Sequence, residues 1–403
     1  MRIGINAFYL GAVTTGSGQY INHLIRQLAQ LGDESEYILV QDARYKIQDT
    51  GNSHPASCIL HPVSTPFDSI SENLAKLWFE QVSFPRACRR QGVELAHVPY
   101  FASPLFPTTP TVVTVHDLIP MLLPAYRGSM LVRLYTLLVA VAAKRADMVL
   151  TDSQASKWDI VHLLDIPSER VRVIYLAADD IYQPVLDSHR LAAIRRKYGL
   201  PQSYLLYLGG FDQRKNVPTL LKAFAQLAKD SRIGDWRFEI RDSRVSLVVA
   251  GQLPDYGLDL AIQAKRSDFF PDPRPIVQEL GIEERVVFTG WVPEEDKPAL
   301  YSGARALVFP SLYEGFGLPP LEALACGTPV IASNRGSLPE IVGDGGLLLE
   351  PDDVEGLAAA MEKLLNDDTL REDLREKGLA HAARFSWEKT ARETLAVYQE
   401  IGE

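Results

Sequence analysis

The sequence predicts two α/β domains in series, each built on a doubly wound parallel sheet. Short, almost wholly apolar runs alternate with helical patterns along the whole chain, as is typical of strands that are covered by helices on both faces. The pattern restarts after a polar stretch near residues 187–202. The length of 403 residues also suits two domains, because a domain has about 100–200 residues.

The first half contains six apolar runs that favour strands and one clear amphipathic helix. Ile21, Leu24, Ile25 and Leu28 recur at helical spacing within a predicted helix over residues 17–31. A ten-residue apolar run over 134–143 predicts a buried core helix, since about 20 residues are needed to cross a bilayer. The predicted strands cover residues 1–10, 37–40, 95–98, 111–115, 148–151 and 171–175.

The second half repeats this alternation. Helices are predicted over residues 217–227 and 319–325, and the polar, proline-containing segment between 251 and 279 favours a helical excursion with a loop. The predicted strands cover residues 204–208, 245–250, 286–288, 306–309 and 330–332.

Composition excludes several classes of protein. The net charge of −10 and pI near 5.4 argue against nucleic acid as a partner, because phosphate neutralisation needs a basic face. Three distant cysteines without a C-x-x-C motif argue against a disulfide framework or a structural zinc site. The N-terminal residues read as a first strand and not as a signal peptide, so we expect a cytoplasmic protein.

The segment 314–329 has the features of a ligand site. A loop with Gly315 and Gly317 precedes a helix, so backbone N–H groups of Gly317 and Leu318 would point off the helix start. Glu314 and Glu322 bracket this start, and a carboxylate suits a sugar or ribose diol because it accepts two hydroxyl hydrogen bonds. A plain strand–loop–helix with solvated glutamates is the alternative.

The same segment, SLYEGFGLPPLEALACGTPVIAS, resembles the E-x7-E motif of retaining GT-B glycosyltransferases, the "glycosyl transferases group 1" family. Further blocks match the family in order, and the resemblance covers nearly the whole chain: SGQYINHLIRQL, VVTVHDLIP, TDSQASKWDI, YLGGFDQRKN, FTGWVPEED and FSWEKTARETLAVY. It implies two Rossmann-like domains that face a central cleft. The acceptor-side domain would cover residues 1–182 and the donor domain 190–382, with a final helix over 383–403 that crosses back to the first domain.

The resemblance also implies roles for individual residues. Glu322 would bind the donor ribose, and Glu314 would lie beside the transferred sugar. Backbone groups would hold sugar hydroxyls and phosphate, or read the nucleobase, at two places: Phe316, Gly317 and Leu318 at the helix start, and Gly290, Trp291 and Val292 in the other turn. Trp291 could equally be a packing residue.

Arg214 and Lys215 are the candidates for binding the donor phosphates. They follow a strand and the glycines Gly209 and Gly210, where many relatives have Gly-Arg, and Lys215 is the stronger candidate. The pyrophosphate leaving group needs its charge neutralised. Because the sequence has no D-x-D pair, we expect these two cations to act without a catalytic metal or other cofactor. A solvated basic turn is the alternative.

The first domain offers weaker candidates. His116 comes just past a buried strand, where α/β sites form, and the family uses this histidine near the donor sugar. Gly16 and Gly18 at a helix start could approach phosphate or acceptor, although a plain turn is equally compatible. We assign no general base, since in this fold the favoured picture is front-face attack with the departing phosphate taking the acceptor proton.

The function predicted is transfer of a hexose from a nucleoside diphosphate sugar, with GDP-mannose the best candidate, to a glycan or lipid-linked acceptor in surface polysaccharide synthesis. A UDP-sugar-dependent transferase, a nucleotide-sugar epimerase and a non-catalytic sugar-binding subunit are the alternatives. Lys76, Arg86, Arg89 and Arg90 form a basic cluster that could touch a membrane peripherally. A solvated helix face in an acidic protein is the favoured explanation of the cluster.

Overall fold

The computed structural model describes residues 1–12, 15–44, 58–229, 245–254 and 269–402, which form two compact units. The first unit comprises Met1–Leu176 and Ser386–Glu403, and the second comprises Ala177–Phe385. The division therefore falls at residues 176 and 386, where the sequence had suggested 182 and 383. Each unit is an α/β body with its own parallel sheet.

The first unit contains a seven-stranded sheet in the order β3-β2-β1-β4-β5-β6-β7, and every pairing is parallel. From β1 the chain adds strands in one direction, and from β4 in the other, so the topological switch point lies between β1 and β4. The strands are β1 (Arg2–Asn6), β2 (Glu36–Asp42), β3 (Cys58–Val63), β4 (Leu95–Val98), β5 (Thr111–Thr114), β6 (Met148–Thr151) and β7 (Val171–Val173).

Helices of the first unit connect these strands, and several begin at a side-chain cap. Thr15 caps α1 and Ser71 caps α2 by accepting from backbone N–H groups in the first turn. The larger elements are α1 (Gly16–Leu31), α2 (Glu72–Trp78), the π-turn η1 (Phe79–Ser83), α3 (Phe84–Arg90), α4 (Ile119–Leu122), α5 (Met130–Ala143), α6 (Gln154–Leu164) and α16 (Trp387–Gly402).

The second unit repeats the plan with a six-stranded parallel sheet in the order β10-β9-β8-β11-β12-β13. Its switch point lies between β8 and β11. The strands are β8 (Tyr204–Leu208), β9 (Ser246–Ala250), β10 (Val286–Gly290), β11 (Ala306–Phe309), β12 (Val330–Ser333) and β13 (Gly346–Leu349).

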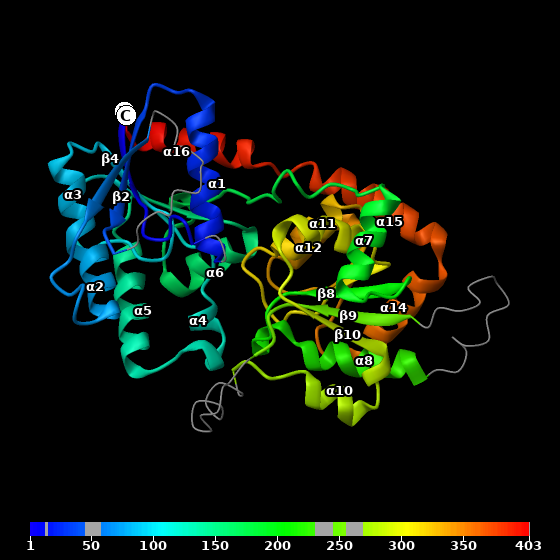
Figure 1. Cartoon of the computed structure of the whole chain (residues 1–403). Helices are drawn as coiled ribbons and strands as arrows, with labels where there is room; N and C mark the ends of the chain where they lie inside the picture. The colour runs from blue at the N-terminus through cyan, green and yellow to red at the C-terminus, as the bar shows by residue number, and fades with distance from the viewer. Residues whose placement is uncertain (13–14, 45–57, 230–244, 255–268, 403) are drawn as a thin grey trace. The chain divides into compact units, whose positions relative to one another are not determined.

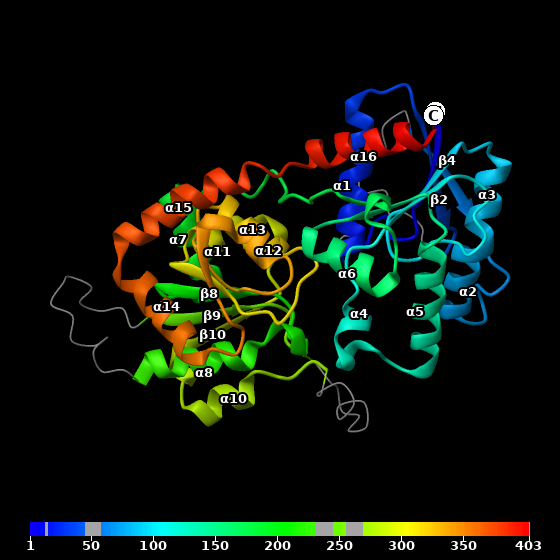
Figure 2. The ribbon, with the colours of Figure 1, turned by 180° about the vertical axis from the view of Figure 1, so that it is seen from behind.

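Helices cover both faces of the second sheet, with α8 and α10 on one side and α7, α11 and α12 on the other (Figures 1 and 2). The predicted doubly wound fold class is therefore confirmed. The larger helices are α7 (Ser188–Tyr198), α8 (Val217–Lys229), α10 (Arg274–Leu280), α11 (Lys297–Ser302), α12 (Leu318–Ala325), α13 (Leu338–Val342), α14 (Val354–Asn366) and α15 (Asp368–Ala382).

The prediction of a buried core helix over 134–143 is wrong. This run forms part of α5, but Leu134, Leu137 and Val141 are 57%, 61% and 42% exposed. Only the small and β-branched residues of the opposite stripe, such as Val139 and Ala143, are buried. A helix that is apolar all round looks identical in sequence whether one or both of its faces are covered.

The structure differs from the predictions for two strands, and one predicted segment is described only in part. The strands β3 and β13 were missed, because β3 is a half-exposed edge strand and β13 is a short Gly-Leu run. Residues 255–268 of the excursion predicted between 251 and 279 lie outside the described residues, and α10 begins within its last part. Within the described part of the chain, every helix is too short or too polar to cross a membrane.

The C-terminal helix α16 belongs to the first unit, where it packs against α1 (Figures 1 and 2). The Tyr398 hydroxyl lies 2.6 Å from Nδ1 of the buried His97, and Thr390 donates to the carbonyl oxygen of Tyr175. Burial of Trp387 against the ring of His23 adds an aromatic contact. These contacts tie the last helix to the first sheet.

Candidate active site

Four charged side chains meet at the switch point of the second unit. Arg214 and Lys215 lie in η4 (Gln213–Lys215), after the end of β8, while Glu314 lies in the loop after β11. Lys215 Nζ is 2.6 Å from Glu314 Oε1, and Arg214 Nη1 is 2.5 Å from Oε2. Arg214 Nε lies 3.1 Å from Asp212 Oδ1. The Glu314 cluster is thus Asp212, Arg214, Lys215 and Glu314.

Glu314 is buried yet charged. Burial alone would raise the pKa of its carboxyl, but Lys215 and Arg214 outweigh that effect and hold the pKa below its usual value. With Asp212, the cluster balances two cations against two carboxylates. A ligand that brings anionic oxygens would therefore compete with these carboxylates for the cations, and it would release Glu314 for other hydrogen bonds.

The Glu314 loop is braced by a segment that the sequence did not single out. Ser337 donates from its hydroxyl to the carbonyl oxygens of Glu314 and Phe316, at 3.0 and 2.5 Å. Gly336 has φ +56°, and a Cβ there would stand 2.6 Å from the Glu314 carbonyl oxygen. A glycine is therefore needed on two counts, conformation and space.

The start of α12 has the geometry predicted for a ligand-binding helix start. Gly317 is the N-cap residue with φ +105°, and no side chain caps the helix. Pro319 and Pro320 carry no N–H, so the backbone donors at this start are those of Leu318 and the residues just before it. Phe316 is buried and packs edge-on against Phe385, and with Gly315 it completes the loop between Glu314 and α12.

Glu322 projects from α12 into surroundings that contrast with those of Glu314. Its Oε2 accepts a 2.8 Å hydrogen bond from the Tyr301 hydroxyl. Burial raises the pKa of Glu322 to about 7, although Lys297 and Tyr301 oppose that rise. Near neutral pH this carboxyl is therefore present in both protonation states, and a ligand whose hydroxyls donate to it would favour the ionised form.

The predicted base-reading turn follows β10. Gly290 has φ +68° and its carbonyl oxygen accepts from the Gly251 N–H at 3.0 Å. Val292 is buried, but Trp291 is 52% exposed, which argues against the packing role left open for it. Lys297 Nζ lies 6.0 Å from the Trp291 ring centroid, and its charge also acts on Glu322. Trp291 and Glu322 therefore share one neighbourhood.

Gly209 and Gly210 end β8 beside the Glu314 cluster. The Gly209 N–H donates to the Ala250 carbonyl oxygen at 3.0 Å, and the Tyr207 hydroxyl donates to the carbonyl oxygen of Gly210. A Cβ on Gly209 would lie 3.1 Å from that hydroxyl. These two glycines let the chain turn closely over the end of the sheet.

His116 lies in the first unit, at the end of β5. Its Nδ1 is 2.7 Å from Asp152 Oδ2 and its Nε2 is 3.3 Å from the Pro99 carbonyl oxygen. Burial would lower the pKa of the imidazole, but Asp152 outweighs burial and raises it. Both ring nitrogens are engaged, so the ring is fixed and is suited to positioning a substrate group.

Gly16 and Gly18 also lie in the first unit, at the start of α1. A Cβ on Gly18 would stand 1.9 Å from the Ala12 carbonyl oxygen, and the Gly18 N–H donates to the capping Thr15 hydroxyl. The lack of a side chain at Gly18 thus has a local structural reason. Gly16 is exposed and has open space around it.

Comparison with known proteins decides the family. The family described as "Glycosyl transferases group 1" matches residues 192–381, and "Glycosyltransferase Family 4" matches residues 14–180. The chain is 31% identical over 391 residues to the O-antigen chain mannosyltransferase B of Escherichia coli, covering 96% of both chains. This protein belongs to the glycosyl transferases group 1 family. It is therefore a glycosyltransferase.

Further similarities extend over the full length of this glycosyltransferase. It is 27% identical to the MMP alpha-(1->4)-mannosyltransferase of Mycolicibacterium hassiacum, over 99% of this chain and 98% of that one. Among solved structures, sucrose-phosphate synthase from Thermosynechococcus elongatus matches with a TM-score of 0.75 and 24% identity, covering 100% and 99% of the two chains. The Anabaena HepE complex with UDP and glucose matches with a TM-score of 0.70 and 17% identity, covering 99% of each. The fold is GT-B.

The four residues of the predicted basic cluster lie in two different environments. Arg86, Arg89 and Arg90 are exposed on α3. The ammonium group of Lys76 instead donates to the Tyr9 hydroxyl at 2.9 Å and lies among aromatic rings. Contact of this unit with a membrane stays a prediction.

Several residues of the site were missed in the sequence. Asp212 stands two residues before Arg214, and it could have been noticed there. Tyr301 and Ser337 reach the two glutamates from elements with no recognisable motif, and Asp152 reaches His116 from the end of β6. Only the fold brings these partners to the motif residues.

Proposed function

We propose that this glycosyltransferase moves mannose from GDP-mannose to a glycan acceptor in surface polysaccharide synthesis, with retention of configuration and without a metal. The Glu314 cluster carries the proposal, because Arg214 and Lys215 converge at the switch point where doubly wound sheets bind ligands. The choice of mannose rests on relatives named mannosyltransferases.

The diphosphate would take the place of the carboxylates beside the two cations. Lys215 and Arg214 then neutralise the charge that grows on the leaving group, the role that a metal ion has in other transferases. Glu314, freed from its ion pairs, becomes an acceptor for hydroxyls of the transferred sugar. The hydrogen bond from the Ser337 hydroxyl to the carbonyl oxygen of Glu314 would keep the backbone of Glu314 in position during this exchange.

The nucleoside would lie toward Glu322 and Trp291. A carboxylate that accepts both ribose hydroxyls must be ionised, so nucleotide binding lowers the raised pKa of Glu322 and releases a proton near neutral pH. Exposed Trp291 offers an apolar surface to the base. His116, whose ring is fixed by Asp152 within the first unit, would contact a sugar hydroxyl.

In the proposed reaction the acceptor hydroxyl attacks the anomeric carbon from the face that the diphosphate leaves. The bond from that carbon to the phosphate oxygen breaks, the new glycosidic bond forms on the same face, and the phosphate oxygen takes the acceptor proton. This chemistry requires positioning and charge stabilisation, and no protein nucleophile.

The test is a panel of GDP-mannose, UDP-glucose and UDP-galactose, each offered with α-1,3-mannobiose as the acceptor, with and without EDTA. We expect release of GDP from GDP-mannose at a rate that EDTA leaves unchanged, and NMR of the product should show the α-configuration. Loss of turnover in EDTA would refute metal independence. Turnover of a UDP-sugar alone would favour the UDP-dependent transferase, and an isomerised nucleotide sugar without free diphosphate would favour the epimerase.

A further inference from the structure

The switch point of the first unit holds a second cluster of polar and aromatic side chains. Asn6 ends β1, and Tyr100 follows the end of β4, the neighbouring strand. The Tyr100 hydroxyl donates to Asn6 Oδ1 at 3.2 Å, and the Phe8 N–H donates to the same oxygen at 3.1 Å. Ligands of doubly wound sheets bind at this point of the topology.

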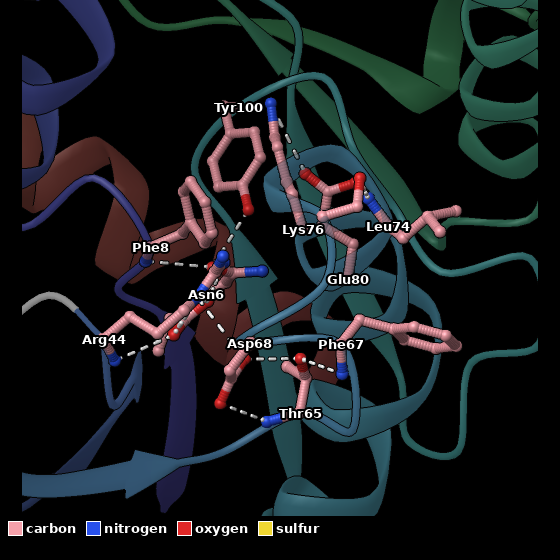
Figure 3. A network of polar contacts seen from close by, with 12 residues as sticks. Asn6, Phe8, Arg44, Thr65, Phe67, Asp68, Leu74, Lys76, Glu80 and Tyr100 are labelled. Atoms are coloured by element: carbon pink, nitrogen blue, oxygen red, sulfur yellow. Dashed lines mark hydrogen bonds and ion pairs between the residues drawn. The ribbon is translucent and has the colours of Figure 1, made fainter.

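Lys76 enters the cluster from α2 (Figure 3). Its ammonium nitrogen donates to the Tyr9 hydroxyl at 2.9 Å. The same nitrogen lies 5.3–5.9 Å from the ring centroids of four aromatic residues, Phe8, Tyr9, Tyr100 and Tyr135. The Lys76 side chain nevertheless keeps 27% of its surface exposed, so the cluster is not sealed from solvent.

Glu80 is the counter-charge of Lys76. It comes from the π-turn η1, is fully buried, and has its Oε1 3.8 Å from Lys76 Nζ. Its Oε2 accepts a 2.8 Å hydrogen bond from the Tyr135 hydroxyl, which projects from α5. π-turns inside helices frequently mark functional sites. The Lys76 cluster is thus Asn6, Phe8, Tyr9, Lys76, Glu80, Tyr100 and Tyr135.

Stability alone does not explain the cluster. Replacement of a buried ion pair by apolar side chains is often neutral or stabilising. The buried Asn6 Nδ2 has no hydrogen-bond partner among the described residues, and a buried donor left unmet destabilises the fold. A cluster with these costs, at the switch point and reachable from solvent through Lys76, has the features of a ligand site.

We propose that the Lys76 cluster is an acceptor subsite that takes an uncharged sugar ring. An ammonium group, tyrosine hydroxyls and aromatic faces together match a sugar, which presents hydroxyls that both donate and accept beside an apolar C–H face. An anionic acceptor group would approach Lys76 only against the carboxylate of Glu80, 3.8 Å away. The identification as an acceptor subsite rests on the proposed transferase function.

The experiment measures binding of α-1,3-mannobiose and of mannose 6-phosphate to the full chain by calorimetry, with GDP saturating. At pH 8, above the pKa of about 7 that burial gives Glu80, this carboxyl is ionised. We expect the neutral disaccharide to bind more tightly than the phosphate. Lys76→Met should weaken the disaccharide about tenfold, equivalent to 1.4 kcal/mol, and leave the affinity for GDP unchanged.

Lys144→Met is the matched control, because Lys144 is an exposed lysine of the same unit, paired only with the exposed Asp165 in the ion pairs of the described structure. It should leave both affinities unchanged. If Lys76→Met fails to fold, Tyr9→Phe removes only the hydroxyl to which Lys76 donates, and it should weaken the disaccharide about threefold, less than 1 kcal/mol.

Two results would overturn the subsite. One is tighter binding of mannose 6-phosphate than of the disaccharide. The other is unchanged disaccharide affinity in both Lys76→Met and Tyr9→Phe. Failure of the proposed function has a different signature: the wild-type chain would then not bind GDP or turn over GDP-mannose, whatever the Lys76 variants do.

Discussion

The two units place different chemistry at the same point of the same topology. Both sheets reverse their strand order between the first and the fourth strand of the unit. In the second unit this point holds two cations and two carboxylates, whereas in the first it holds four aromatic rings around one lysine–glutamate pair. In the two proposals the topology fixes where a ligand binds, and the side chains decide whether that ligand is a charged diphosphate or an uncharged sugar.

The carboxyl groups show the difference most directly. Glu314, Glu322 and Glu80 are all buried. Two adjacent cations hold the pKa of Glu314 below its usual value, while burial raises the pKa of Glu322 and of Glu80 to about 7. Burial is similar for all three, so the number and distance of the cations decide the charge.

The largest effect is expected from Lys215→Met. Removing a group that stabilises developing charge costs about 10²–10³-fold in turnover. The variant also leaves Glu314 with Arg214 as its remaining ion-pair partner among the described residues, so the loss of stability should stay below the about 3–5 kcal/mol that a buried charge without any partner costs. Turnover of GDP-mannose and urea unfolding measure the two effects separately.

A second substitution separates those effects. In Lys215→Met/Glu314→Gln the carboxylate that lost its lysine partner is gone, so stability should return toward wild type while turnover stays low. Lys222→Met, an exposed lysine on α8, is the control and should change neither quantity. Recovered turnover in the double variant would show that Lys215 serves only to neutralise Glu314.

The next effect is a pH dependence of stability at Glu322. Its folded pKa of about 7 exceeds the unfolded value of about 4.3, so the folded state holds the proton longer. Stability is therefore lost as pH rises from about 4.5 to 7, by about 3–4 kcal/mol for this group. Glu322→Gln should remove that loss, and thermal unfolding at pH 5 and pH 8 measures it.

Glu314→Gln should change the pH dependence of stability in the opposite direction. Because the folded pKa of Glu314 is lowered, its ionisation contributes stability above the unfolded pKa and that contribution is lost on acidification. Because this loss occurs below the unfolded pKa of about 4.3, Glu314→Gln should reduce stability at pH 5 more than at pH 3. The same sign of change in both variants would contradict the contrast between the two carboxyls.

A smaller effect is expected from Gly336→Ala, which tests whether the backbone at residue 336 must lie close to Glu314. An alanine at this position would be strained by the positive φ, and its Cβ would clash with the carbonyl oxygen of Glu314. Gly281→Ala is the matched control, since Gly281 has φ +67° and open space around it. We expect about 1 kcal/mol of destabilisation in the control, and a further loss of about 1–3 kcal/mol with reduced turnover in Gly336→Ala. Equal losses of stability in the two variants would mean that the contact between residue 336 and the Glu314 carbonyl oxygen is not tight.

The sequence predicts the second switch point better than the first for a physical reason. Arg214, Lys215 and Glu314 lie in two short contiguous segments, and the sheet order brings those segments together. The Lys76 cluster draws on residues scattered between 6 and 135, so the sequence alone suggested that Lys76 belonged to a basic surface. The sequence also could not predict that one face of the apolar helix α5 is exposed, because exposure depends on which elements cover the helix.

The smallest expected effect concerns Trp291, the exposed aromatic residue of the donor side. If it contacts the nucleobase, Trp291→Ala should weaken GDP binding by about 1 kcal/mol, within the range of aromatic stacking on a base, and leave stability within about 0.5 kcal/mol. Trp158→Ala, at a tryptophan of the first unit that is 61% exposed, should change neither quantity. Calorimetry with GDP, guanosine and ribose 5-phosphate distinguishes the cause, because loss of a base contact weakens the first two ligands and spares the third. An equal loss for ribose 5-phosphate would mean that Trp291 acts through Lys297 and Glu322. Aromatic side chains would then contact a ligand only in the proposed subsite of the first unit.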